Sequence, residues 1–202
     1  MQNPATDKIM RVSERAVASL QDATAVLQRL VQDDRHVAVL EQVVECVADA
    51  FRSGHKVLAC GNGGSACDAM HFCEELTARF RGNRQALPAM ACSDAGFITC
   101  AGNDFGYERV FERWVEAFGQ KGDVLVVLTT SGTSINVLRA VKAAQKRGMR
   151  TVAMLGRDGG DLGGVCDHEW IVPGETSDRI QELHMLLLHI VVECIEVKMG
   201  LA

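Results

Sequence analysis

The sequence predicts an α/β fold in which a parallel β-sheet is covered by helices on both faces. From Lys56 onward, short apolar segments alternate with stretches of helical periodicity, a pattern typical of β–α units. Two of the apolar segments run into turns rich in Gly, Ser or Thr that open a helix, as expected at the carboxyl ends of parallel strands. The length of 202 residues suits one such domain with a helical extension.

Composition is that of an ordinary globular protein, with 48% hydrophobic and 23% charged residues. The net charge of −5 and the lack of a long basic run argue against nucleic acid as a partner. No apolar run approaches the roughly 20 residues that span a bilayer, and the polar start MQNPATDKIM lacks the features of a secretory signal. We therefore expect a soluble, cytoplasmic protein without a membrane partner.

The eight cysteines include no CxxC pair, which argues against a zinc ribbon and, without a secretory signal, against a disulfide framework. We expect reduced thiols that pack as small hydrophobic groups. The cysteines in apolar surroundings, which are expected to be buried, are Cys46, Cys60, Cys92, Cys100 and Cys194.

Two helices are expected before the first strand, over residues 6–32 and 36–53, because apolar residues recur every three or four positions. Gly54 ends the second helix. Since neither helix belongs to a β–α unit, the apolar faces must pack on the domain or on another subunit, and we expect mainly the latter. These faces contain Ile9, Val12, Ala16, Leu20, Ala23, Leu27 and Leu30 in the first helix and Val37, Leu40, Val44, Val47 and Phe51 in the second.

The remaining elements alternate along the chain. The expected strands are KVLAC, LPAMACS, DVLVVLT, MRTVAMLG and HEWIVP. Helices are expected after the glycine-rich turn, over 134–147 and over 177–199. With three prolines and no Ser/Gly linker, residues 1–202 are expected to form a single domain. Within it, residues 1–54 would be a helical extension and 55–202 an α/β core.

Two turns have the composition of an anion-binding site. The first is CGNGGS, over 60–65, and the second is TTSGTS, over 129–134. At the start of a helix, backbone N–H groups and the positive end of the helix dipole converge, and glycine lets an anion come close. Neither turn matches a P-loop or GxGxxG, so nucleotide binding is not expected. Each could be a tight turn with a helix cap, but two in one domain favour a phosphate group.

A second set of residues has the types used in acid–base or metal chemistry. His71 and Glu75 are four residues apart, so they lie on one face of a helix. In the last expected helix, Gln181 and His189 share a face with an offset of about 80°, whereas His184 lies roughly 140° from His189. Each polar group among apolar neighbours needs a partner, which a structural hydrogen bond would supply. Alternatively, His71, Glu75, Gln181 and His189 converge on one divalent ion, and their N and O donors suit zinc.

Taken together, these motifs resemble the phosphoheptose isomerase (sedoheptulose-7-phosphate isomerase) family of the sugar isomerase (SIS) group. The resemblance rests on GNGGS with HFCEEL, on NDFGYE, on TTSGTS and on DRIQELHMLLLH, and it covers nearly the whole chain. It implies the SIS fold, a three-layer sandwich with a parallel, Rossmann/flavodoxin-like sheet. It also implies a homotetramer with sites at subunit interfaces, in which the two N-terminal helices take part in oligomerisation.

The resemblance also implies roles for individual residues. Glu75 and His189 match the catalytic acid/base pair. One zinc ion per subunit would be bound by His71, Glu75, Gln181 and His189. Residues that match substrate contacts are Asn62, Gly63, Gly64, Ser65, Glu75, Asn103, Asp104, Thr129, Thr130, Ser131, Ser134 and Gln181.

The implied activity is the isomerisation of sedoheptulose 7-phosphate to D-glycero-D-manno-heptose 7-phosphate through an enediol. This reaction is the first step of ADP-heptose or GDP-heptose biosynthesis, which supplies lipopolysaccharide or another glycan. An alternative is a non-catalytic phosphosugar-binding regulator, like the replication-initiator-associating protein of the same group. That protein lacks counterparts of His189 and of HFxEEL, so an enzyme is favoured. A third possibility is an isomerase for a smaller phosphosugar, against which the long leading helices and the Gln/His helix argue.

Overall fold

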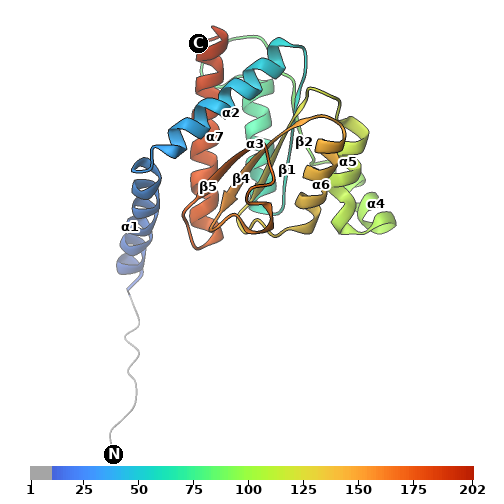
Figure 1. The fold of residues 1–202 in the computed structure, drawn as a ribbon. Helices are drawn as coiled ribbons and strands as arrows, with labels where there is room; N and C mark the ends of the chain where they lie inside the picture. The colour runs from blue at the N-terminus through green and yellow to red at the C-terminus, as the bar shows by residue number, and fades with distance from the viewer. Residues whose placement is uncertain (1–10) are drawn as a thin grey trace, which may run out of the picture.

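The computed structural model describes residues 11–202 and contains a five-stranded sheet in which all neighbouring strands are parallel (Figure 1). The strand order is β2-β1-β3-β4-β5, the order of flavodoxin-like sheets. The predicted α/β class is therefore confirmed. The strands are β1 (Val57–Gly61), β2 (Ala89–Ala91), β3 (Val124–Thr129), β4 (Arg150–Gly156) and β5 (His168–Val172).

Helices cover both faces of the sheet, so alternate strand residues enter two separate cores. Val57 and Ala59 of β1 belong to a core with α1, α2, α3 and α7, whereas Leu58 and Cys60 belong to a core with α4, α5 and α6. This two-sided burial explains why the strands are apolar throughout rather than alternating. The helices are α1 (Val12–Val31), α2 (Arg35–Arg52), α3 (Gly64–Thr77), α4 (Ala95–Phe105), α5 (Val110–Phe118), α6 (Ile135–Lys146) and α7 (Ser177–Met199), with 3₁₀ turns η1 (Tyr107–Arg109) and η2 (Gly160–Leu162).

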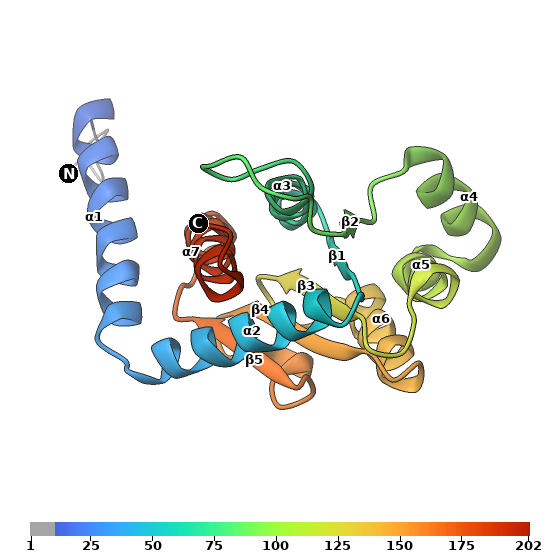
Figure 2. The same cartoon turned by 90° about the horizontal axis from the view of Figure 1, so that it is seen from above.

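The two leading helices differ in how they pack. Val44, Val47 and Phe51 of α2 are buried in the chain's own core, where α2 lies against α7. The expected subunit contact is therefore wrong for these three residues, because α7 supplies an apolar partner within the same chain, whereas Val37 of the same face is 58% exposed. Helix α1 extends from the body (Figures 1 and 2), and its Leu20 is 70% exposed. The predicted start of the first helix, with Ile9, lies outside the described residues.

All eight cysteines are free thiols. Cys46, Cys60 and Cys92 are buried as predicted, and Cys194 is half-buried. Cys100 is exposed, contrary to the prediction, because α4 buries only Ala101. Among residues 11–202, no helix combines the length and the apolarity needed to cross a membrane.

Asp123 fixes the register between β1 and β3. Its carboxylate is 1% exposed and accepts hydrogen bonds from the backbone N–H of Lys56 at 3.1 Å and of Gln120 at 2.9 Å. The Lys56 ammonium lies 2.5 Å from Oδ2, the oxygen that also accepts from Gln120. This pairing sets Val57 beside Val124, and the same register brings Gly61 beside Leu128 at the opposite ends of the strands.

His184 is a buried histidine that we expect to make the protein sensitive to acid. The side chain is fully buried and its Nε2–H donates to the Leu155 carbonyl at 2.9 Å, while Nδ1 has no partner. Burial lowers the pKa of His184 from 6.5 to about 4, an effect that the hydrogen bond to Leu155 partly offsets. Between these two values the unfolded chain binds a proton that the native protein does not. The free energy of unfolding should therefore fall by about 1.4 kcal/mol per pH unit on this account, and by about 3 kcal/mol from pH 6.5 to pH 4.

Urea unfolding of the wild type and of His184→Met between pH 7.5 and pH 4 measures this contribution. The variant should show a flatter decline of unfolding free energy with falling pH, because it has no group to protonate at this position. Equal slopes for the two proteins would show that His184 is not responsible.

Candidate active site

The site lies where the strand order changes direction, at the carboxyl ends of β1 and β3. In open parallel sheets this switch point leaves a crevice in which ligands bind. The turn over 60–65 follows β1 and the turn over 129–134 follows β3. Because β1 and β3 are neighbours, the two turns predicted to bind an anion lie side by side. The structure thus brings together segments that are far apart in the sequence.

The glycine turn leads directly into α3, which begins at Gly64. Gly64 lies directly against the end of the Gln181 side chain, since a Cβ on it would lie 2.6 Å from Oε1 of Gln181. The Gln181 amide on α7 also donates to Ser65 Oγ at 3.4 Å. The predicted residues Gly64, Ser65 and Gln181 are therefore neighbours at this edge of the sheet.

Asn62 of the same turn is held on both sides of its amide. It exchanges two hydrogen bonds with Asn136, at 3.0 and 2.8 Å, and its Oδ1 also accepts one from Tyr107 OH at 2.9 Å. Asn136 is 3% exposed and lies at the start of α6, so it ties the glycine turn to the hydroxyl turn. Neither Asn136 nor Tyr107 is predicted as a site residue. The signals in the sequence are that Asn136 follows the TTSGTS turn closely and that Tyr107 belongs to the NDFGYE segment.

The hydroxyl turn, residues 129–134, presents several donors at the start of α6. Thr129 is buried, and its hydroxyl accepts from the Gly132 N–H at 3.2 Å, so its side chain supports the turn from inside. Thr130 Oγ1 lies 3.0 Å from Ser177 Oγ at the start of α7. Thr130, Ser131 and Ser134 are partly exposed. The turn can therefore offer both hydroxyls and backbone N–H groups to an anion.

Helices α3 and α7 bring His71, Glu75 and His189 into one cluster. One ligand atom from each lies within 4.8 Å of the other two. His71 Nε2 is 3.2 Å from Glu75 Oε1, and the rings of His71 and His189 meet edge to face with centroids 5.1 Å apart. Two imidazoles and a carboxylate can hold a divalent metal ion or exchange protons. His184 faces the core instead, in agreement with its predicted angular offset.

Asp68 adds a further carboxyl group to this part of α3, one turn before His71. Its Oδ2 atom is buried and has no hydrogen-bond partner. Burial raises the pKa of Asp68 to about 6, and the charge of His71 partly offsets this effect. Asp68 is not among the predicted site residues, although its position three residues before His71 places both on one helix face.

Asn103 and Asp104 are not brought to the cluster within one chain. They are exposed at the end of α4, where Asn103 Nδ2 donates to Asp104 Oδ1 at 2.8 Å. Figure 2 shows α4 on the far side of α3 from α7. The other predicted residues lie at the carboxyl ends of β1 and β3 or on α3 and α7.

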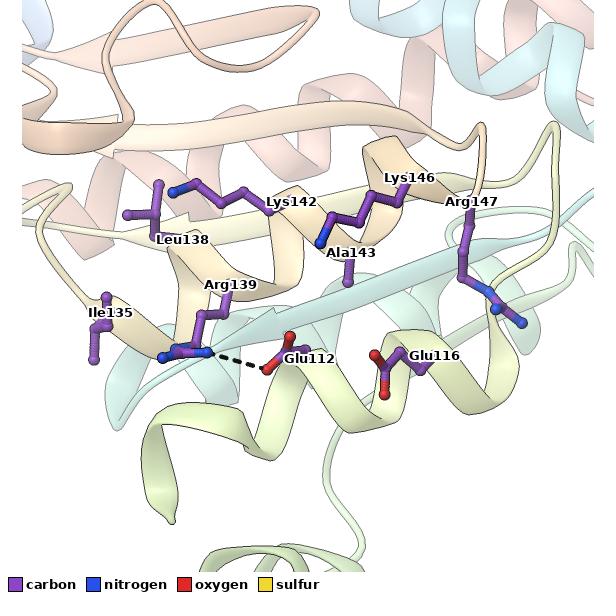
Figure 3. Close-up of a pocket in the computed structure, with 9 residues that line it drawn as sticks. All are labelled: Glu112, Glu116, Ile135, Leu138, Arg139, Lys142, Ala143, Lys146 and Arg147. Carbon is purple, nitrogen blue, oxygen red and sulfur yellow. Dashed lines mark hydrogen bonds and ion pairs between the residues drawn. The ribbon is translucent and has the colours of Figure 1, made fainter. Parts of the chain in front are cut away.

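A separate groove runs between α5 and α6 (Figure 3). Its walls carry both signs of charge, and Arg139 Nη1 lies 3.5 Å from Glu112 Oε2. Hydrogen bonding to Arg109 is the main cause that lowers the pKa of Glu112. None of the predicted site residues, all within the described range, lines this groove. The groove is therefore a solvent-exposed surface between two packed helices and not part of the candidate site.

The chain is similar to known proteins along most of its length. A family model described as SIS domain matches residues 7–156. Phosphoheptose isomerase from Vibrio cholerae is 50% identical over 184 residues, which are 91% of this chain and 96% of the relative. Its counterpart from Fusobacterium nucleatum is 49% identical over 180 residues, 89% of this chain and 93% of the relative.

Two solved structures are similar to this chain over nearly its whole length. The phosphoheptose isomerase structure from Neisseria gonorrhoeae has a TM-score of 0.87 and 39% identity, covering 93% of this chain and 100% of its own. The one from Francisella tularensis has a TM-score of 0.89 and 32% identity, with the same coverage.

Proposed function

Since the chain belongs to the phosphoheptose isomerase family of SIS-domain proteins, we propose that it isomerises sedoheptulose 7-phosphate to D-glycero-D-manno-heptose 7-phosphate through an enediol. This step would begin ADP-heptose or GDP-heptose biosynthesis. The observation that carries the proposal is the His71, Glu75 and His189 cluster on helices α3 and α7, whose N-termini lie close to the two donor-rich turns. Such an arrangement provides a phosphate anchor next to groups that move protons.

The phosphate group would bind at the hydroxyl turn. Thr130, Ser131 and Ser134 offer hydroxyls, and the N-terminus of α6 adds backbone N–H groups and a positive dipole end. The sugar would then extend past the glycine turn, where Asn62 to Ser65 provide polar contacts, toward Glu75 and Gln181. Anchoring the distant phosphate lets its binding energy orient the reacting carbons.

Glu75 would take the proton from the carbon next to the carbonyl, and His189 would serve the sugar oxygens as the acid. The Glu75 side chain is 18% exposed, so it is accessible yet largely shielded from water. A carboxylate has two oxygens, so one can be held by His71 or an ion while the other accepts a proton. General acid–base groups of this kind contribute about 10²–10⁴-fold to the rate.

The donor set of the cluster fits zinc. Imidazole nitrogens and carboxylate oxygens are common zinc ligands, with distances of about 2 Å to the ion. A cluster spanning 4.8 Å needs only small side-chain rotations to meet around one ion. His71, Glu75 and His189 would hold it, with Gln181 as the fourth ligand. When bound, the ion would polarise the carbonyl and hydroxyl oxygens of the sugar.

The assembly would be a homotetramer with each site at a subunit interface. Two observations support this: Asn103 and Asp104 lie away from the cluster within one chain, and α1 leaves Val12 and Leu20 exposed at 87% and 70%. A neighbouring subunit could supply the missing contacts and cover α1.

We further propose that residues 1–202 act as one SIS domain, with 1–54 as its helical extension and 55–202 as the phosphosugar-binding core. We also propose a cytoplasmic location, because free cysteines are typical of proteins in that reducing compartment.

The function is tested by NMR of the purified protein with sedoheptulose 7-phosphate in D₂O, with zinc and after chelation. We expect the aldose to appear with zinc, with deuterium incorporated at carbon, and to be lost after chelation. Conversion that survives chelation would show that the reaction does not need the metal, while still establishing the isomerase activity. Ligand-induced shifts without conversion in either sample would contradict the enzyme and favour a binding module.

Removing the Tyr107 hydroxyl should weaken substrate binding slightly. In Tyr107→Phe, Asn62 loses one of the hydrogen bonds that orient its amide but keeps both with Asn136. Losing one such bond costs about 1 kcal/mol, so we expect KM to rise roughly fivefold with little change in kcat. Steady-state kinetics measures both, and an unchanged KM would show that Tyr107 does not orient Asn62 for binding.

A further inference from the structure

The loop over 78–88, between α3 and β2, contains a buried arginine that joins two helices of the site. Arg84 and Glu196 of α7 form an ion pair at 2.7 Å, with side chains that are 2% and 5% exposed. The same guanidinium donates to the carbonyls of Glu75 at 2.5 Å and of Leu76 at 2.7 Å, at the end of α3. Arg84 therefore connects the backbone of Glu75 with helix α7.

This arrangement suits arginine in particular. The last carbonyls of a helix have no partner within it and form the negative end of the helix dipole. A guanidinium has five N–H donors in a rigid plane, so it can bind these carbonyls and a carboxylate at once. A buried ion pair is by itself weak support for stability, because removing both charges from water is costly. Because Arg84 contacts both the end of α3 and helix α7, its contacts point instead to a role in setting the relative position of these two helices.

Glu196 lies seven residues after His189, two turns further along the same face of α7. The loop also lays Phe80 against His189, with ring centroids 5.7 Å apart. Through Arg84 and Phe80, the loop thus contacts the helix of His189, and Arg84 also binds the backbone of Glu75. The separation of α3 and α7 sets how Glu75 and His189 face each other. Because the loop contacts both helices, it is in a position to fix this separation.

We propose that Arg84, paired with Glu196, is a positioning residue that holds Glu75 and His189 in the geometry needed for metal binding and proton transfer. The proposal rests on the proposed function in taking these two as the acid/base and metal-binding groups. Arg84 itself does not contact the substrate in this scheme. It acts through the end of α3 and through α7.

The chain offers a matched control three positions earlier on both segments. Arg81 of the same loop pairs with Glu193 of α7 at 2.6 Å, but these side chains are 67% and 44% exposed. Exposed pairs contribute little to stability. Arg81 makes no hydrogen bond to the end of α3 among those of the described residues.

The experiment compares the full chain with the double variant Arg84→Met/Glu196→Met and the control Arg81→Met/Glu193→Met. Apolar side chains of similar volume often replace a buried ion pair without loss of stability, so the first variant should fold, as its melting temperature will show. We expect its zinc affinity, measured by chelator competition, to fall about 10–100-fold, as for other residues that orient metal ligands. Its kcat should also fall, with KM for sedoheptulose 7-phosphate nearly unchanged. Arg84→Lys should recover part of both losses, since it keeps the charge.

A metal-free readout separates this proposal from the proposed function. In ¹⁵N spectra without zinc or substrate, the ring signals of His71 and His189 should shift in the Arg84/Glu196 variant but not in the control. If the wild type has no isomerase activity, the proposed function fails, while this spectral comparison still decides the role of Arg84. Should the double variant unfold, Glu196→Gln, which keeps the side-chain shape, replaces it. A folded variant that matches the control in histidine signals, zinc affinity and kcat would overturn the proposal.

Discussion

Glu75→Gln is expected to lower kcat for sedoheptulose 7-phosphate by about 10³-fold, because glutamine keeps the shape of the side chain but cannot accept the proton. Glu75 lies 3.2 Å from His71, is mostly shielded from water, and supplies the carboxylate of the His71, Glu75 and His189 cluster among the described residues. The fold should persist, since the backbone carbonyl of Glu75, not its side chain, binds Arg84. NMR detection of the aldose gives the rate, and thermal unfolding checks the fold.

Glu74→Gln is the matched control for this substitution. Glu74 is the preceding residue on α3, lies 3.8 Å from His71 and is 71% exposed, so it faces water rather than the cluster. We expect its kcat to stay close to that of the wild type. Retained activity in Glu75→Gln would exclude Glu75 as the base, and equal losses in both variants would point to the charge of α3 instead.

Gly132→Ala is expected to destabilise the protein by about 3 kcal/mol and to disrupt the hydroxyl turn. Gly132 has φ +68°, and a Cβ there would lie 1.9 Å from the carbonyl oxygen of Gly159. The clash is with backbone, so either the turn or the 159–160 segment must move. That movement displaces the N–H groups and hydroxyls at the start of α6, so KM should rise roughly tenfold or more, the effect of losing one or two hydrogen bonds. Urea unfolding and steady-state kinetics give the two effects.

Gly54→Ala isolates the part of this effect that comes from the close contact. Gly54 also has a positive φ, +77°, but nothing lies within 4 Å of an added Cβ. The substitution should cost about 1 kcal/mol of conformational strain and leave KM unchanged. If Gly132→Ala costs no more than Gly54→Ala, then the approach of Gly159 does not matter to the turn.

Local patterns were enough to predict the sheet and the shared helix face of His71 and Glu75. Runs such as DVLVVLT are buried on both faces, so each gives a strong strand signal, and the spacing of His71 and Glu75 fixes their shared helix face. The partner that covers an apolar helix face could not be predicted in this way. The apolar stripe of α2 is the same whether it meets α7 or another subunit, and only the tertiary structure decides for α7.

The polar contacts made between distant segments also escape prediction from the sequence. Asn136 and Arg84 look like ordinary polar residues on a helix and in a loop. Their importance comes from burial and from partners 74 and 112 residues away, Asn62 and Glu196. For Asn103 and Asp104, the expected contact with the substrate remains a prediction, because both are exposed at the end of α4, a helix that lies on the far side of α3 from α7.

The pairing of β1 with β3 has a consequence for the order of folding. Lys56 and Asp123, which fix this register, are 67 residues apart, so the chain must close a long loop before the two turns can meet. Contacts of this kind slow the folding of a domain, since the entropy of closure is lost before the contacts form. Nascent chains that end before residue 129 would contain the glycine turn and α3 but not the hydroxyl turn, which we propose binds the phosphate. Binding of a phosphosugar should therefore report that β1 and β3 have joined.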